Sequence, residues 1–215
     1  MIIQYSWVYT FPMAPSEQYP TTETISETIL AAALRRFEQF GYSKTTMAEI
    51  AADCDMSAAN IYRYFENKLE IGAQLARRCL AEECTALTEV INTPAAASER
   101  LTGFLLGNLR YTYQRWSEQP RINELVEAIA RERTDVVQEH LRIKQELVIK
   151  LIDEGNGNGE FSVADPKRTA EAILVASTVF DVPLFMHMHP YDKFESLARN
   201  VADLILRGLV ARPAA

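Results

Sequence analysis

Apolar side chains recur every three to four residues along almost the whole chain after residue 23, and no stretch alternates apolar with polar positions as a strand does. This period predicts an all-α fold. Short segments rich in Gly, Pro, Asn and Asp separate one apolar stretch from the next. The helices that the pattern predicts span residues 24–40, 46–53, 58–64, 67–91, 98–117, 120–132, 134–154, 166–181 and 191–209.

The start of each of the first four predicted helices carries a side chain that can cap it. Thr24, Thr46 and Asn67 each precede a glutamate by three residues, the spacing of a capping box, and Ser57 opens the third helix. Gly41 follows the first helix, where a left-handed residue ends it. The second and third helices are too short to stand alone, so we expect them to pack on the first.

Two short capped helices packed on a longer one form a tri-helical unit, the helix-turn-helix that places its last helix in a DNA major groove. The side chains predicted to form its core are Phe37, Phe40, Ile50, Ala51, Met56, Ile61 and Phe65. On the third helix the positions left outward combine small, amide, aromatic and basic groups. These positions are Ala58, Ala59, Asn60, Tyr62, Arg63 and Tyr64.

The stretch from Phe40 to Lys68 resembles the DNA-binding domain of the tetracycline-repressor (TetR) family. The resemblance rests on Phe40-Gly-Tyr42, Thr45-Thr-Met47, Ile50-Ala51, Met56-Ser57 and Ile61-Tyr-Arg-Tyr-Phe-Glu-Asn-Lys68, and it covers roughly residues 24–80 without a gap. It implies a helix-turn-helix domain joined through a long helix to a helical bundle for ligand binding and dimerisation. The division expected is a tail over 1–20, a DNA-binding domain over 21–80 and a ligand and dimerisation domain over 81–210.

By this resemblance a homodimer sets two recognition helices into successive major grooves of a palindromic operator, about 34 to 36 Å apart. Thr46, Tyr62 and Lys68 stand where the family binds phosphates, and Ala58 and Ala59 stand where it often reads bases. The same hydroxyls and tyrosines also fit a reading in which they only cap or pack helix ends. The full candidate DNA-binding set is Thr45, Thr46, Ser57, Ala58, Ala59, Asn60, Tyr62, Arg63, Tyr64 and Lys68.

Charge changes this picture in one respect. The net charge of −7 alone would disfavour a nucleic-acid partner. Residues 24–78 carry equal numbers of basic and acidic side chains, so the rest of the chain holds the whole excess. DNA binding is therefore expected to rest on a few well-placed contacts.

Beyond residue 85 the resemblance implies a dimer through the last two helices and a small-molecule effector within the bundle. The aliphatic positions of 166–181 and 191–209 suit an interface between subunits, although a core within one chain would look the same. A pocket of this kind needs aromatic and polar side chains, although an aromatic on a helix more often belongs to the core than to a pocket. The candidates are Phe104, Asn108, Tyr111, Trp116, Glu127, Phe180 and Phe185. The function predicted is a repressor that a small, largely apolar ligand releases from its operator. The effect of the ligand is expected to pass through helix 67–91, as the sole link between the two domains.

Other classes of site and function fit less well. His187 and His189 have no third ligand at a fixed spacing, so neither a metal nor a cofactor is expected. A di-iron oxidase needs Glu-x-x-His pairs, which the three histidines lack, and a helical adaptor leaves the capped unit unexplained. Three cysteines without a CxxC spacing and no apolar run of membrane-spanning length predict a cytoplasmic protein without a membrane segment. Met13 is an alternative start to Met1.

Overall fold

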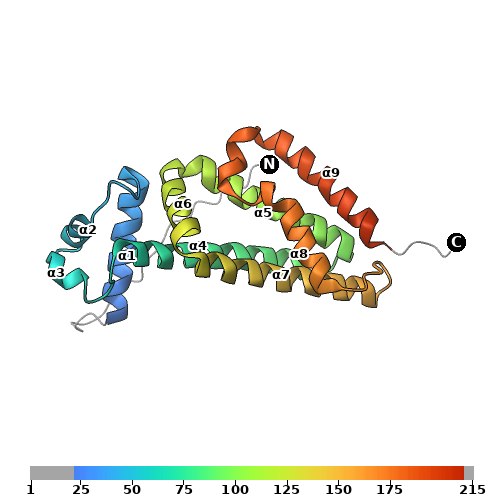
Figure 1. Cartoon of the computed structure of the whole chain (residues 1–215), viewed down its shortest axis with the longest axis horizontal. Helices are drawn as coiled ribbons and strands as arrows, with labels where there is room; N and C mark the ends of the chain where they lie inside the picture. The colour runs from blue at the N-terminus through green and yellow to red at the C-terminus, as the bar shows by residue number, and fades with distance from the viewer. Residues whose placement is uncertain (1–21, 211–215) are drawn as a thin grey trace.

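A computed structural model describes residues 22–210, and within that range every regular element is helical (Figure 1). The expected tail, and the choice between Met1 and Met13, lie outside the described residues. The all-α prediction is confirmed. The elements are α1 (Thr22–Phe40), α2 (Met47–Asp53), α3 (Ala58–Ile61), α4 (Lys68–Ile91), α5 (Ala97–Glu118), η1 (Pro120–Ile122), α6 (Asn123–Glu132), α7 (Thr134–Gly157), α8 (Pro166–Ser177), η2 (Thr178–Phe180), η3 (Pro183–Met188) and α9 (Tyr191–Leu209).

Three of the four predicted caps form. The Thr46 side chain accepts from the Glu49 amide, the Ser57 side chain from Asn60 and the Asn67 side chain from Glu70. Each bond satisfies one of the free amides of a first helical turn.

The cap predicted at Thr24 is wrong, because α1 already includes Thr22 and Thr24 therefore lies inside the helix. The Glu27 carboxylate instead pairs with the guanidinium of Arg78 on α4. A capping box is a local signal for where a helix can begin, and α1 begins before it.

The helix-turn-helix core forms largely as the sequence predicts. Phe37, Ile50 and Ile61 are completely buried, and Gly41 takes the positive φ of +90° that the end of α1 needs. Phe40 is the exception, since 47% of its side chain is exposed and the Arg36 guanidinium stacks on its ring. Phe40 therefore belongs to the surface of α1.

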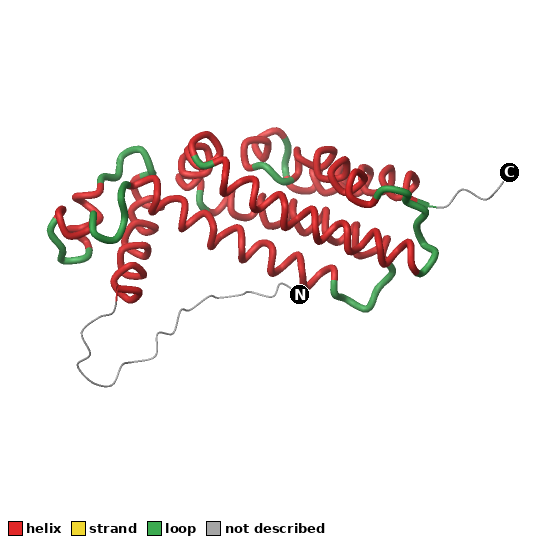
Figure 2. Tube along the Cα trace, turned by 60° about the horizontal axis from the view of Figure 1, so that its bottom comes forward, coloured by secondary structure: helices red, strands yellow, loops and turns green. Residues whose placement is uncertain are grey.

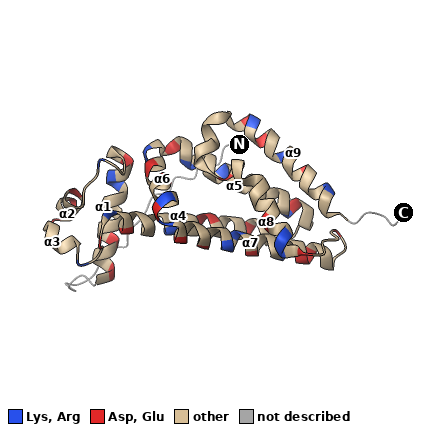
Figure 3. Cartoon of the chain, viewed as in Figure 1, with Lys and Arg blue, Asp and Glu red and all other residues tan. Residues whose placement is uncertain are grey.

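The remaining helices form an elongated bundle that extends from the helix-turn-helix at one end of the molecule (Figures 1 and 2). Helix α4 contacts α5 and α7, α5 contacts α7 and α9, and α7 contacts α8. Figure 3 shows acidic and basic residues interspersed along α4 and α7. The bundle thus buries apolar stripes from several helices under a mixed-charge surface.

Helix α4 is not the sole link between the two ends of the molecule, contrary to the sequence prediction. Leu125 and Ile129 of α6 are part of the same apolar core as α1 to α3. A Cβ atom on Gly72 would lie 2.6 Å from a Leu125 methyl carbon, so α6 is pressed against the start of α4. Helix α6 therefore completes the core of the DNA-binding unit.

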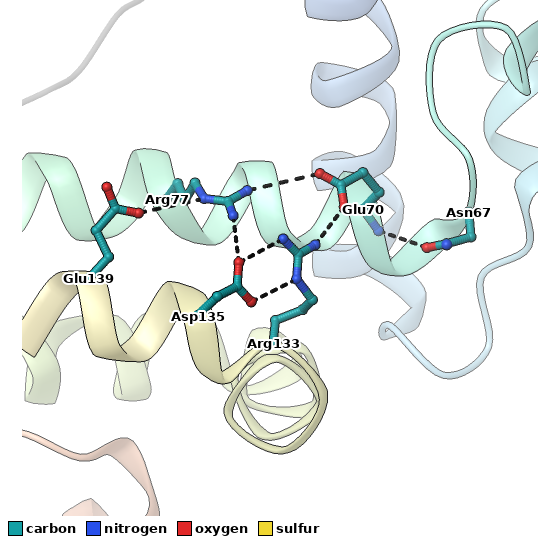
Figure 4. A network of polar contacts seen from close by, with 6 residues as sticks. All are labelled: Asn67, Glu70, Arg77, Arg133, Asp135 and Glu139. Atoms are coloured by element: carbon teal, nitrogen blue, oxygen red, sulfur yellow. Dashed lines mark hydrogen bonds and ion pairs between the residues drawn. The ribbon is translucent and has the colours of Figure 1, made fainter.

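A polar network fixes the corner between α6 and α7 to the beginning of α4 (Figure 4). Arg133 reaches Glu70 over 2.5 Å and holds Asp135 through two hydrogen bonds. Arg77, two turns along α4 from Glu70, donates to the same Asp135 at 2.9 Å. The hydrogen bonds from Arg133 lower the pKa of Asp135 to about 2, so its charge persists at any ordinary pH.

Part of the aliphatic stripes expected at a subunit interface packs inside the chain. Ala170, Ile173 and Leu209 are buried in the bundle core, and Ile205 packs against the same cluster. Leu204 is an exception, because 68% of it is exposed. The outward faces of α8 and α9 still expose large aliphatic side chains, Val175 and Leu204.

Candidate nucleic-acid interface and effector pocket

Helix α3 lies at the tip of the molecule, turned away from the bundle (Figure 1). Ala58, Ala59 and Arg63 are exposed, and Tyr62 exposes 54% of its surface. Asn60 and Tyr64 are half-buried, and Tyr64 packs against the core. The helix proper ends at Ile61, shorter than predicted, and a hydrogen-bonded turn carries residues 62–65 onward. Ala58, Ala59, Tyr62 and Arg63 are thus exposed as the sequence predicts, whereas Asn60 and Tyr64 are only partly exposed.

Thr46 combines an exposed position with an occupied hydroxyl. Its Oγ1 donates to Glu49 Oε2 at 2.8 Å and accepts from the Glu49 amide at 3.3 Å. The bond from the Thr46 hydroxyl, and a second one that the Thr46 backbone amide donates to the same oxygen at 2.8 Å, lower the pKa of Glu49, so that carboxylate stays ionised near neutral pH. A phosphate oxygen bound at Thr46 would have to compete with Glu49 for the hydroxyl proton.

Thr45 does not lie on the candidate surface. Only 2% of it is exposed, and its hydroxyl donates to the Gly41 carbonyl at 2.9 Å. The side chain ties the end of α1 to the residue that precedes the α2 cap, so it is not available to a partner at this surface.

Lys68 is partly buried beneath the loop between α1 and α2. Its Nζ donates to the carbonyl oxygens of Tyr42 and Thr45, each at 2.7 Å, and lies 4.3 Å from the centre of the Tyr42 ring. Burial lowers the pKa of Lys68 from its ordinary value. An ammonium group has three N–H donors, so one remains for a phosphate.

Arg36 contributes to this end of the molecule in a way that sequence reasoning missed. Its guanidinium donates two hydrogen bonds to Asp53, at 2.5 and 2.9 Å, and lies 3.4 Å from Glu49. The pairing clamps both ends of α2 onto α1. A basic residue on α1 with two acids on α2 was visible in the sequence, but only the fold brings them together.

A cavity of about 480 Å³ lies between the end of α5, α6 and η3. Only Trp116 and Glu127 of the seven predicted pocket residues line it. Phe104, Asn108 and Phe180 are buried in the bundle, Phe185 packs against the core, and the Tyr111 hydroxyl donates to the Cys79 carbonyl at 2.9 Å. The other lining residues are Asn123, Val126, Ala130, Arg131, Val182, Pro183, Leu184 and His187.

Asn108 stands out within the bundle because it is 98% shielded from solvent yet neither its amide nitrogen nor its amide oxygen has a hydrogen-bond partner. It lies one turn before Thr112, whose hydroxyl faces the Asp181 carbonyl at 3.4 Å. A buried amide without partners is unfavourable, which makes Asn108 the pocket candidate that the fold itself leaves unexplained.

A buried ionic cluster joins α4, α7 and the end of η2, and sequence reasoning missed it. Lys144 is fully buried and donates to Glu83 at 2.5 Å and to Asp181 at 2.6 Å. His140 Nε2 lies 3.6 Å from the second Glu83 oxygen. The available signal was Lys144 itself, which shares an apolar helix face with Val148 and Leu151.

Among residues 22–210 no group of three metal-ligating side chains is positioned to hold a metal ion, and His187 and His189 are no exception. No helix in the same range is long and apolar enough to cross a bilayer.

Two capped short helices on a long first helix, with α3 exposed at the tip, place the chain in the class of helix-turn-helix DNA-binding proteins. A family model described as bacterial regulatory proteins, tetR family, matches residues 29–75, and a model described as tetracyclin repressor-like, C-terminal domain, matches residues 97–202. The chain belongs to the TetR family of DNA-binding transcriptional regulators.

Similar proteins agree with this membership. The chain is 26% identical over 187 residues to YhgD of Bacillus subtilis (strain 168), an uncharacterised HTH-type transcriptional regulator, covering 85% of this chain and 95% of YhgD. A TetR-family regulator from Mesorhizobium loti has the same fold, with a TM-score of 0.68 at 15% identity over 88% of this chain and 98% of that chain. The structure of a SmeT–triclosan complex matches with a TM-score of 0.61 at 20% identity, over 87% and 92% of the two chains.

Proposed function

We propose that the protein is a dimeric repressor that binds a palindromic operator and leaves it when a small, largely apolar molecule occupies the bundle. Family membership supports DNA binding. The exposed position of α3 supports the choice of the residues that we propose to contact the DNA. Because DNA is the partner, we place the protein in the cytoplasm.

Exposed Ala58 and Ala59 allow α3 to approach the base edges closely, and their methyl groups suit contact with thymine methyls. Exposed Arg63 has the reach for a guanine or a phosphate. Around them, Thr46, Ser57 and Tyr62 offer hydroxyls to phosphates, and Lys68 offers one N–H beside the N-terminus of α4.

The proposed dimer forms through the outward faces of α8 and α9. Val175 and Leu204 expose 69% and 68% of their surfaces, and the exposed Ala172 and Ala176 leave room for a partner helix to approach. Exposed large aliphatic side chains beside small residues suit helix–helix packing between subunits. This face differs from the buried stripe that the sequence favoured.

The cavity between α5, α6 and η3 is our proposed effector site because one wall of it is also a support of the DNA-binding unit. Leu125 and Ile129 of α6 pack into the core of α1 to α3, whereas Val126, Glu127 and Ala130 of the same helix line the cavity. A ligand that displaces α6 would therefore act directly on the helix-turn-helix. Trp116, Val126 and Leu184 suit an apolar body, and the related SmeT structure contains triclosan.

A gel-retardation assay with DNA from the protein's own promoter region tests the proposal. A regulator shifts this DNA in preference to a scrambled duplex of equal length, while an enzyme or a protein adaptor shifts neither. Loss of the shift on adding a candidate apolar compound would identify that compound as an effector. An unchanged shift with every compound would contradict the proposed release by a ligand.

A further inference from the structure

The ionic cluster of Glu83, Lys144 and Asp181 carries an unbalanced charge away from water. One ammonium group faces two carboxylates, at 2.5 Å and 2.6 Å. The exposed fractions are zero for the Lys144 side chain, 5% for Glu83 and 17% for Asp181. With every group ionised the cluster has a net charge of −1, and a buried net charge is costly.

The surrounding titratable groups do not supply the missing positive charge. On α7, burial lowers the pKa of His140 to about 4, so its imidazole is neutral near pH 7. On α4, burial raises the pKa of Cys79 and raises that of Cys84 to about 11, so both are thiols. On α5, burial likewise raises the pKa of Tyr111, which stays a phenol. Arg115 of the same helix attracts Glu83 only weakly, and its guanidinium lies 3.6 Å from the Glu82 carboxylate.

Asp181 connects this cluster to the proposed effector site. The next residues along the chain, Val182, Pro183 and Leu184, form one wall of the cavity between α5, α6 and η3. Lys144 belongs to α7, so its contact with the Asp181 carboxylate fixes the beginning of that wall to the bundle.

We propose that the Glu83–Lys144–Asp181 cluster binds one proton near neutral pH and that this proton controls the wall of the effector pocket. With the proton on Glu83, Lys144 and Asp181 form a neutral pair that keeps the segment after Asp181 fixed to α7. Without the proton, the Glu83 carboxylate competes for Lys144 and the cluster gains a negative charge. Asp181, the more exposed of the two acids, then moves toward water and the 181–188 segment loosens.

The electrostatics support this direction. Burial, together with the repulsion from Asp181, raises the pKa of Glu83 to about 7 despite the attraction of Lys144. Burial alone would lower the pKa of Lys144, but the two carboxylates outweigh it and raise that pKa, so the lysine keeps its charge. The proton that leaves as the pH rises is therefore the one on Glu83.

Trp116 lines the same cavity and reports on its wall. The chain has one other tryptophan, Trp7, so a Trp7→Phe protein makes Trp116 the single tryptophan, which can be excited at wavelengths that the tyrosines do not absorb. We expect its emission to change in one step with a midpoint near pH 7 between pH 5.5 and 8.5. In Glu83→Gln, which keeps the size and the acceptor oxygen of the glutamate, the step should vanish.

Two further variants separate this site from its neighbours. Asp181→Asn weakens the anchor at every pH, so its emission should resemble that of the alkaline parent throughout. His187→Gln removes a titratable ring that also lines the cavity, and the step should persist in it. A step that survives Glu83→Gln, a step lost in His187→Gln, or a parent without any step would each overturn the proposal.

Urea unfolding gives a second readout that does not depend on fluorescence of the pocket. A glutamate whose pKa is raised on folding stabilises the protein most at pH values below its unfolded pKa, and this contribution is lost as the pH rises toward 7. The urea midpoint of the parent should therefore fall between pH 5 and 8 by more than that of Glu83→Gln, and equal falls would contradict the proposal. The inference rests on the proposed role of the pocket, but neither assay uses DNA or effector, so their failure would leave the DNA-binding proposal untouched.

Discussion

The backbone amide of Ser43, in the loop between α1 and α2, donates a 3.0 Å hydrogen bond to the carboxylate of Glu124, 81 residues further along on α6. The side-chain amide of Gln119 donates a second hydrogen bond, to the carboxylate of Glu38 on α1 at 2.9 Å. Glu124, Leu125 and Ile129 make α6 a direct support of the DNA-binding unit, beside α4, and Gln119 adds a contact from the residue that follows α5. Helix α6 thus lines the proposed effector pocket and also contacts the loop that precedes α2.

Glu124→Gln should release that loop. The hydrogen bond from Ser43 lowers the pKa of Glu124, so the ionised acid is the better acceptor, and the loop should also loosen as the pH falls through the acid range. Hydrogen exchange of the peptide covering 41–47 should become faster in the variant. Glu127→Gln, one turn along on the cavity side of α6, is the matched control. Unchanged protection in Glu124→Gln would show that the contact does not restrain the loop.

Lys68→Ala should affect both stability and DNA binding. The variant loses two charge-assisted hydrogen bonds to carbonyl oxygens, which contribute roughly 1 to 3 kcal/mol together in a partly buried site. If Lys68 also contacts a phosphate, binding to every duplex weakens alike and the salt slope falls by about 0.9. Arg142→Ala, on the exposed face of α7, serves as the control. A lower melting temperature with an unchanged salt slope would confine Lys68 to a structural role.

Asn108→Leu should stabilise the protein. The substitution removes an amide whose two polar atoms are buried without partners and replaces it with an apolar group of similar size. The free energy of unfolding, measured in urea, should rise by about 1 to 3 kcal/mol. A fall in the free energy of unfolding would mean that the amide is satisfied in the folded protein.

Leu204→Glu should disrupt the proposed dimer. The substitution places a charge at the centre of the outward face of α9, where 68% of the leucine is exposed in one chain. Light scattering after size exclusion should report the mass of one chain instead of two. Leu141→Glu, on α7 with 45% of the leucine exposed, controls for a charge on another apolar surface position. Two chains per particle in Leu204→Glu would place the interface elsewhere.

The sequence was most informative where structure is local. The caps Thr46, Ser57 and Asn67 act within three residues, so their spacing alone predicted α2, α3 and the start of α4. The outward placement of Ala58 and Ala59 followed from the same helix register.

The errors arise where distant parts of the chain compete for the same residue. Glu27 pairs with Arg78 rather than with its own helix end, and the apolar stripes of α8 and α9 turn inward because the bundle offers them a core. No periodicity within α6 reveals that Leu125 completes a core begun at residue 29. The pocket residues were hardest to predict, since an aromatic on a helix has the same pattern in a core as in a cavity.

Ala59 provides the most direct test of the central claim that α3 reads DNA in a dimer. A hydroxyl-radical footprint of the parent protein on its own promoter DNA should show two protected half-sites, about 34 to 36 Å apart. In Ala59→Glu both should disappear at an unchanged melting temperature, because the position is exposed and the carboxylate would face the groove unpaired. Ala86→Glu, at an exposed position on α4, should leave the footprint intact. Protection that persists in folded Ala59→Glu would contradict the account.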